Sequence, residues 1–181
     1  MKNKLGKSTQ ILSGTNVLEI STDVSGAFAG RLLSIYGADV ITVEPPKGHP
    51  TRYESVWSDD KNPENSTMFA YLGSGKQSIQ LDLQDKNQIS YLNKLALNSD
   101  VVIENFAPGV IERLGLSYEQ LCAIRPEIIM LSSAGLGHSG PDMKHVAYGT
   151  LVQCFTGWSS LQGYPGRETE LVSGIWTDPM V

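Results

Sequence analysis

The sequence predicts an α/β fold built on a mainly parallel, open sheet with flanking helices. Short runs of β-branched and apolar residues alternate along the chain with segments whose apolar residues recur at helical spacing. Residues 17–44 also read as strand, turn, helix and strand within roughly 30 residues, the length of one βαβ unit. Such units join parallel strands through a right-handed crossover, so the chain is expected to begin its sheet here.

The first unit shows each of its parts in order. Residues 17–20 form a β-branched strand, and residues 21–26 form a polar turn. Apolar side chains then recur as in a helix, which Gly37 ends because glycine takes positive φ without penalty. A second strand follows at 39–43. Ligands of parallel sheets bind at the carboxyl ends of the strands, so we expect chemistry at the turn that contains Asp23.

The later segments continue the alternation. We expect further strands at 78–83, 101–103 and 128–133, and helices at 86–97, 108–114, 117–124 and 147–155. Ser117 and Gln120 have the spacing of a capping box, which favours a helix that begins there. Residues 45–67 are polar and proline-rich, and they predict a long loop.

Composition excludes several classes of protein. The chain has 181 residues, 40% hydrophobic and 18% charged, which are the values of one globular core without a disordered tract. The formal net charge is −5 and no run of lysine and arginine occurs, so we expect no nucleic-acid partner. No apolar run approaches the ~20 residues of a membrane span. Cys122 and Cys154 lie in apolar helical patterns, which predicts buried free thiols and a cytoplasmic location.

The chain divides into a lead-in and one domain. Residues 1–15 are basic at first but lack an apolar signal core, whereas residues 16–181 carry the α/β pattern. The sequence stops at 177–181 in mid-pattern, so we expect it to be a fragment that is incomplete at its C-terminus.

Four stretches resemble, in the same order, the motifs of the class III CoA-transferases, also called the CaiB/BaiF family. They are GADVITVEPP at 37–46, KQSIQLDL at 76–83, DVVIENFAPG at 100–109 and SAGLGHSGP at 133–141. Each stretch alone is a weak signal, but together they cover almost the whole chain and are highly specific.

The resemblance implies a Rossmann-like domain that binds coenzyme A (CoA) and carries the catalytic residue, without a metal. Full chains of the family are about twice as long as this one, and in them a second domain and a returning C-terminal segment complete an interlocked dimer. We therefore expect acyl-CoA and small carboxylic acids as substrates. We also expect a homodimer or related heteromer at full length, with activity that requires the missing half.

Asp178 is the candidate nucleophile. On spacing alone, an aspartate in Trp-Thr-Asp-Pro is typical of a turn or a helix cap. The family places its catalytic aspartate beyond a Gly- and Pro-rich turn in a Gly-x-x-x-Asp setting, which Gly174 and Asp178 resemble. A carboxylate that attacks a thioester gives a mixed anhydride of comparable reactivity, so the energy of the thioester is kept.

The resemblance also implies a set of CoA-binding residues: Asp23, Val24, Ser25, Lys76, Asn105, Phe106, Arg113 and Tyr148. In the family, CoA lies across the turn after the first strand, although Asp23 or Ser25 could equally cap a helix. Lys76 and Arg113 resemble cations for the CoA phosphates, and surface lysines and arginines are their ordinary alternative. Phe106 could equally belong to the core.

Tyr148 separates the two enzyme classes of the family. Racemases that act on α-methylacyl-CoA place a histidine–aspartate pair at this position to move a proton, whereas tyrosine fits the transferase pattern. His138 and His145 share no spacing that indicates catalysis or metal binding. The transferase is therefore the leading hypothesis. A racemase, or a CoA- or nucleotide-binding module without catalysis, is the alternative; a dinucleotide enzyme is disfavoured because no G-x-G-x-x-G follows the first strand.

Overall fold

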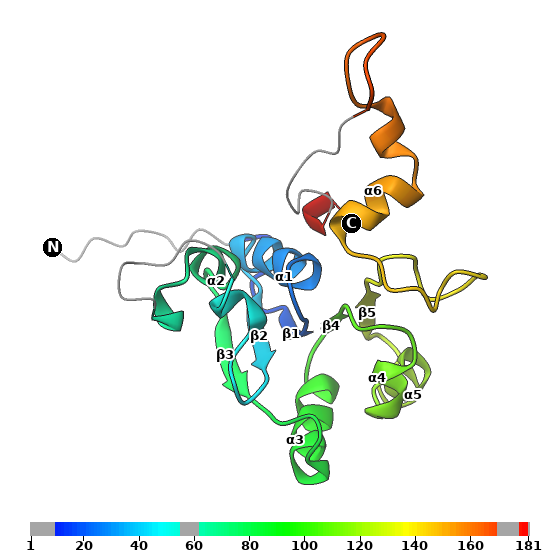
Figure 1. Cartoon of the computed structure of the whole chain (residues 1–181). Helices are drawn as coiled ribbons and strands as arrows, with labels where there is room; N and C mark the ends of the chain where they lie inside the picture. The colour runs from blue at the N-terminus through cyan, green and yellow to red at the C-terminus, as the bar shows by residue number, and fades with distance from the viewer. Residues whose placement is uncertain (1–9, 55–61, 170–177, 181) are drawn as a thin grey trace, which may run out of the picture.

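The centre of the protein is a five-stranded, wholly parallel sheet in the order β3-β2-β1-β4-β5 (Figure 1). The structure is a computed structural model, and it describes residues 10–54, 62–169 and 178–180. The strands are β1 (Asn16–Ile20), β2 (Asp39–Glu44), β3 (Gln77–Gln80), β4 (Val101–Glu104) and β5 (Ile129–Ser132). The predicted α/β, Rossmann-like fold with a parallel open sheet is confirmed.

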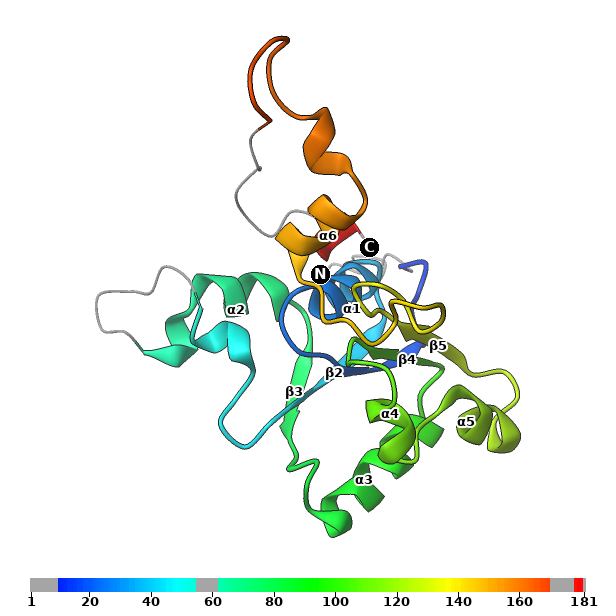
Figure 2. The same ribbon diagram turned by 45° about the vertical axis from the view of Figure 1, so that its right-hand side comes forward.

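Helices cover both faces of the sheet (Figures 1 and 2). One face carries α1 (Ser25–Ile35) and α2 (Thr67–Leu72), and the other carries α3 (Lys86–Leu97), α4 (Val110–Arg113) and α5 (Tyr118–Ile124). The segment with α6 (Gly149–Phe155) and the 3-10 helix η3 (Trp158–Leu161) extends outward on the α1 side. Three further 3-10 helices are η1 (Pro50–Arg52), η2 (Pro63–Asn65) and η4 (Asp178–Met180).

The core has two parts because successive strand residues point to opposite faces. Leu18 and Val102 face α3, α4 and α5, and together with Leu92 and Leu116 they are completely buried. Their neighbour Val17 faces α1 instead. A sheet covered on both faces favours strands that are mainly apolar, and the inner strands β1, β2 and β4 are mainly apolar although each contains a buried glutamate.

Local signals predicted most element boundaries. Gly37 has φ +103° and follows the end of α1, as expected. The capping box is confirmed, because the Ser117 N–H donates to Gln120 Oε1 at 3.0 Å and the Gln120 N–H donates to Ser117 Oγ at 3.3 Å. The helix after β4 was expected from residue 108 but begins at Val110, because Gly109 before it takes a left-handed conformation (φ +89°).

Two further expectations were wrong in detail. The strand predicted at 78–83 is observed as β3, which ends at Gln80. All four residues of β3 are exposed, and β3 is the edge strand of the sheet. Cys154 was expected to be buried but is exposed on α6, while Cys122 is partly buried; both are free thiols. No described helix has the length and apolar composition needed to span a bilayer.

Candidate functional site

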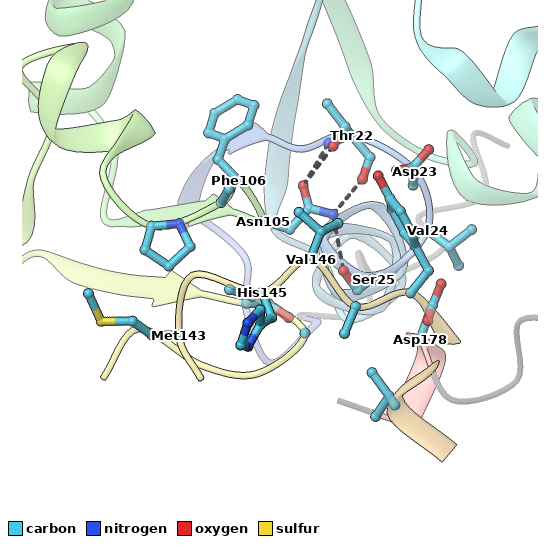
Figure 3. Close-up of a pocket in the computed structure, with 18 of the residues that line it drawn as sticks. Thr22, Asp23, Val24, Ser25, Asn105, Phe106, Met143, His145, Val146 and Asp178 are labelled. Atoms are coloured by element: carbon cyan, nitrogen blue, oxygen red, sulfur yellow. Dashed lines mark hydrogen bonds between the residues drawn. The ribbon is translucent and has the colours of Figure 1, made fainter. Parts of the chain in front are cut away.

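A cavity of about 240 Å³ lies at the carboxyl ends of β1, β4 and β5. Its walls are the turn at residues 22–25, the loop at 105–108, parts of the long loop between β5 and α6, and Asp178 of η4 (Figure 3). From β1 the chain adds β2 and β3 in one lateral direction, and it then returns to add β4 and β5 next to β1 in the other direction. The cavity therefore lies where the strand order reverses, between β1 and β4. Parallel α/β sheets bind their ligands at such a point.

Asn105 joins the turn after β1 to the end of β4. The Thr22 N–H donates to its Oδ1 at 2.7 Å, and its Nδ2 donates to the Thr22 carbonyl and to Ser25 Oγ, the latter at 3.1 Å (Figure 3). Asp23, in the middle of the turn, has φ +57°, a left-handed conformation that aspartate tolerates better than most residues. One amide side chain therefore fixes a strained turn against the neighbouring strand.

Helix α1 starts directly from this turn. Its N-cap residue is Val24, and no side chain caps its first turn. An uncapped helix N-terminus presents backbone N–H groups and a partial positive charge to an anion or a carbonyl oxygen. Figure 3 shows Asp178 on the same side of the cavity as Val24 and Ser25. The carboxylate, the turn and the helix start thus share one wall.

The structure brings together seven of the nine residues that the sequence indicated. They are Asp23, Val24, Ser25, Asn105, Phe106, Tyr148 and Asp178. Phe106 both lines the cavity and packs against the larger core, so its two expected roles are compatible. Tyr148 precedes α6 and is 64% exposed. The exposed Arg113 is not among the residues that line the cavity.

Lys76 also lies outside the cavity, in surroundings that the sequence did not suggest. It was expected in an exposed, glycine-flanked turn, but its side chain is only 2% exposed. Its Nζ donates to Glu19 Oε2 and to the Ala27 carbonyl, each at 2.6 Å. It lines a second cavity of about 210 Å³ beside β2, together with Glu44, His49 and others. This geometry does not support contact between Lys76 and a CoA phosphate.

Three buried carboxylates at the carboxyl edge of the sheet were not predicted from the sequence. Glu19, Glu44 and Glu104 stand at or next to the ends of β1, β2 and β4, and each is at most 1% exposed. A single acidic residue at the carboxyl end of an otherwise apolar strand is the signal that could have found them. Glu104 accepts from the Phe106 N–H at 2.9 Å through Oε2, while its Oε1 lies 3.6 Å from His138 Nε2.

His49 and His145 lie in different surroundings. His49 is buried, and burial lowers its pKa; its Nδ1 accepts from the Thr51 N–H at 3.3 Å at the start of η1. His145 lines the cavity but is largely exposed, with Nδ1 3.3 Å from Asp142. Within residues 10–54, 62–169 and 178–180, no three acidic, histidine or cysteine side chains form a group that could hold a metal ion.

Comparison with known proteins decides the family. A sequence model described as CoA-transferase family III matches residues 12–181, which is most of the chain. The protein belongs to CoA-transferase family III. It is 35% identical over 162 residues to the acetyl-CoA:oxalate CoA-transferase of Acetobacter aceti, a match that covers 89% of this chain and 41% of that protein. It is 34% identical to the succinyl-CoA–D-citramalate CoA-transferase of Chloroflexus aurantiacus, covering 86% of this chain and 38% of that protein.

Solved structures agree with this placement. The crystal structure of a CaiB/BaiF family protein from Brucella suis superposes with a TM-score of 0.85 at 33% sequence identity, over 94% of this chain and 45% of that one. A protein from Mycobacterium tuberculosis gives a TM-score of 0.82 at 28% identity, over 93% and 46%. The family III chain described here thus spans less than half the length of these relatives.

Proposed function

We propose that the protein is an acyl-CoA:carboxylate CoA-transferase, which moves CoA from an acyl-CoA donor to a small carboxylic acid. The observation that carries the proposal is the cavity that places Asp178 beside the turn at 22–25 and the end of β4. The relatives named for CoA transfer to oxalate or D-citramalate support carboxylic acids as the substrate class.

Asp178 acts as the nucleophile. Its carboxylate attacks the thioester carbonyl of the donor, which releases CoA thiolate and leaves an acyl-aspartyl anhydride. The thiolate then attacks the aspartyl carbonyl, releasing the donor acid and forming an aspartyl-CoA thioester. The acceptor carboxylate attacks that thioester to give a new anhydride, and the released thiolate attacks its acyl carbonyl. The products are the new acyl-CoA and a free Asp178 carboxylate, so no oxidant or co-reactant is consumed.

The start of α1 and the other residues at the cavity bind and orient CoA. The uncapped start of α1 would stabilise the oxyanion that forms as each carbonyl is attacked, because its N–H groups are fixed in advance. Phe106 and Tyr148 provide apolar surface for the pantetheine chain, and Asn105 holds the turn over which CoA lies. The exposed Arg113, whose Nη1 folds back toward Gly109, would meet a phosphate outside the cavity.

We further propose that the protein works in the cytoplasm, as a homodimer or a related heteromer. Free cysteines, one of them exposed, suit a reducing compartment. The outward segment carries exposed apolar side chains, among them Phe155 at 61% and Leu161 at 81%, of the kind that partners cover. One relative is named as the alpha subunit of a succinyl-CoA–L-malate CoA-transferase, which implies subunits in that protein.

Trapping at Asp178 tests the proposal in the protein at its natural length. With acyl-CoA present and acceptor withheld, hydroxylamine should convert Asp178 to a hydroxamate, located by mass spectrometry of peptides. Asp178→Asn should lower the turnover number by about 10³-fold or more while CoA affinity stays nearly unchanged. Asp178→Glu displaces the oxygen by about one bond length and should be almost as harmful.

A matched control removes a different carboxylate. Asp39→Asn changes an exposed aspartate at the amino end of β2, the opposite edge of the sheet, and should leave transfer intact. An enzyme without its nucleophile does not keep as much as about a tenth of its turnover. If Asp178→Asn kept more than that, the carboxylate would be structural and the proposed mechanism wrong.

A further inference from the structure

Lys76 reaches past β2 to a buried glutamate of β1. It directly precedes the edge strand β3, and β2 lies between β3 and β1, yet its ammonium meets Glu19 of β1. Glu19 is completely buried and its other oxygen accepts from Ser21 Oγ at 2.8 Å. Removing one partner of a buried ion pair leaves the other charge buried alone, which is strongly destabilising. Lys76 and Glu19 therefore depend on each other.

The same ammonium holds the first turn of α1. Its second acceptor is the carbonyl of Ala27, the third residue of the helix, at 2.6 Å. The residues immediately before that turn, Thr22 to Ser25, line the CoA cavity. Lys76 therefore connects the helix start to β1 without lining the cavity itself.

Gly30 keeps the space that this arrangement needs. A Cβ atom at Gly30 would overlap Glu19 Oε2 and would lie 3.3 Å from Lys76 Nζ. Burial lowers the pKa of Lys76, while the charge of Glu19 opposes that shift. With two acceptors already in place and 2% of its side chain exposed, the ammonium is a poor partner for a phosphate in solvent.

We propose that Lys76 is a positioning residue that fixes the first turn of α1, and with it the 22–25 wall of the cavity, through Glu19 and the Ala27 carbonyl. The consequence for CoA rests on the proposed function, whereas the consequence for the turn does not. The role differs from the direct phosphate contact that the sequence resemblance implied.

Two measurements on the protein at its natural length test this role in Lys76→Met. Amide hydrogen exchange without ligand should accelerate at residues 22–28 and stay unchanged in β4, at Val102 and Ile103. CoA should bind roughly tenfold or more weakly, because a misplaced wall costs affinity. The slope of log Kd against log salt should match the wild type, because no charge that faces CoA has been removed.

The double variant Glu19→Gln/Lys76→Met covers the case in which the single variant fails to fold. It leaves no charge buried alone, and the amide oxygen of the introduced glutamine would still accept from Ser21, so it should fold and show the same local acceleration. Lys144→Met is the contrast, since Lys144 is exposed and lines the cavity: its loss should reduce the salt slope.

Each outcome decides between the roles. A smaller salt slope in Lys76→Met would mean direct contact with a phosphate and would overturn the proposal. Unchanged amide exchange at residues 22–28 would also overturn the proposal. Faster exchange throughout the sheet would overturn it as well, because it would show that Lys76 only stabilises the fold in general. A wild-type protein that binds no CoA would contradict the proposed function alone, because the exchange measurement would still decide the positioning role.

Discussion

The Arg52 guanidinium donates two hydrogen bonds to the carboxylate of Glu44: Nε lies 2.6 Å from Oε2, and Nη2 lies 2.8 Å from Oε1. Ser78 Oγ also donates to Oε1, and the His49 N–H donates to Oε2 at 2.7 Å. This pairing ties the loop after β2 to the strand end and to the start of β3. Burial alone would raise the pKa of Glu44, but these hydrogen bonds outweigh it and lower the pKa to about 2.

The low pKa of Glu44 predicts a specific acid dependence of stability. A depressed pKa contributes stability above the ordinary value of 4.5, and that contribution is lost as pH falls from there toward about 2. Arg52→Met leaves the carboxylate buried without its cation, which should cost on the order of 3 kcal/mol at pH 7. The variant should then lose less stability than the wild type as the pH falls from 4.5 toward about 2, because the ion pair that acid breaks is already absent.

Urea unfolding at a series of pH values measures this effect. Glu64→Gln is the control, since Glu64 is the other partner of Arg52 but its side chain is 71% exposed; it should change stability by less than about 1 kcal/mol. An Arg52→Met protein with the same pH profile as the wild type would show that the pair does not set the acid response.

Asn105→Asp should loosen the turn that lines the cavity. Aspartate can accept from the Thr22 N–H, but its second oxygen would face the Thr22 carbonyl in place of a donor. A partly buried hydrogen bond replaced by a repulsive contact costs about 1–3 kcal/mol, so CoA affinity should fall by roughly tenfold or more. Calorimetric titration with CoA measures the change.

Asn98→Asp is the matched control for that substitution. The Asn98 amide also donates to a backbone carbonyl, that of Lys94 at 2.7 Å, but at the exposed end of α3. Its CoA affinity should equal that of the wild type. Equal affinity of Asn105→Asp and Asn98→Asp would mean that the turn does not contact CoA.

Tyr148 predicts that the full-length enzyme does not racemise. A phenol is a weak base at neutral pH, and the described wall of the cavity holds no histidine–aspartate pair at this position. Incubation of a 2-methylacyl-CoA in deuterated water should therefore leave its α-position unlabelled by mass spectrometry. Label above that of a protein-free sample would contradict the transferase assignment, and its loss in His145→Gln would identify the base.

The sequence by itself determined the elements and the edge of the sheet at which the site lies. The periods of apolar residues, the glycine at 37 and the capping box at Ser117 act within a few residues, so they are readable in order along the chain. Parallel strands bring their carboxyl ends to one edge, so the residues after β1 and β4 could be expected together. The resemblance to the family motifs supplied the remaining candidate site residues, Asp178 among them.

Only the tertiary structure decided which charged side chains are buried and with which partners. Lys76 stands between a glycine and a glutamine, a local setting typical of an exposed turn, yet its partner Glu19 lies 57 positions earlier. Asn105 likewise depends on Thr22, 83 positions away. Local periodicity reports only which face of an element is apolar. The burial of a charge depends on the strand order and on the close approach of α1 that Gly30 permits, and both arise from contacts between residues far apart in the chain.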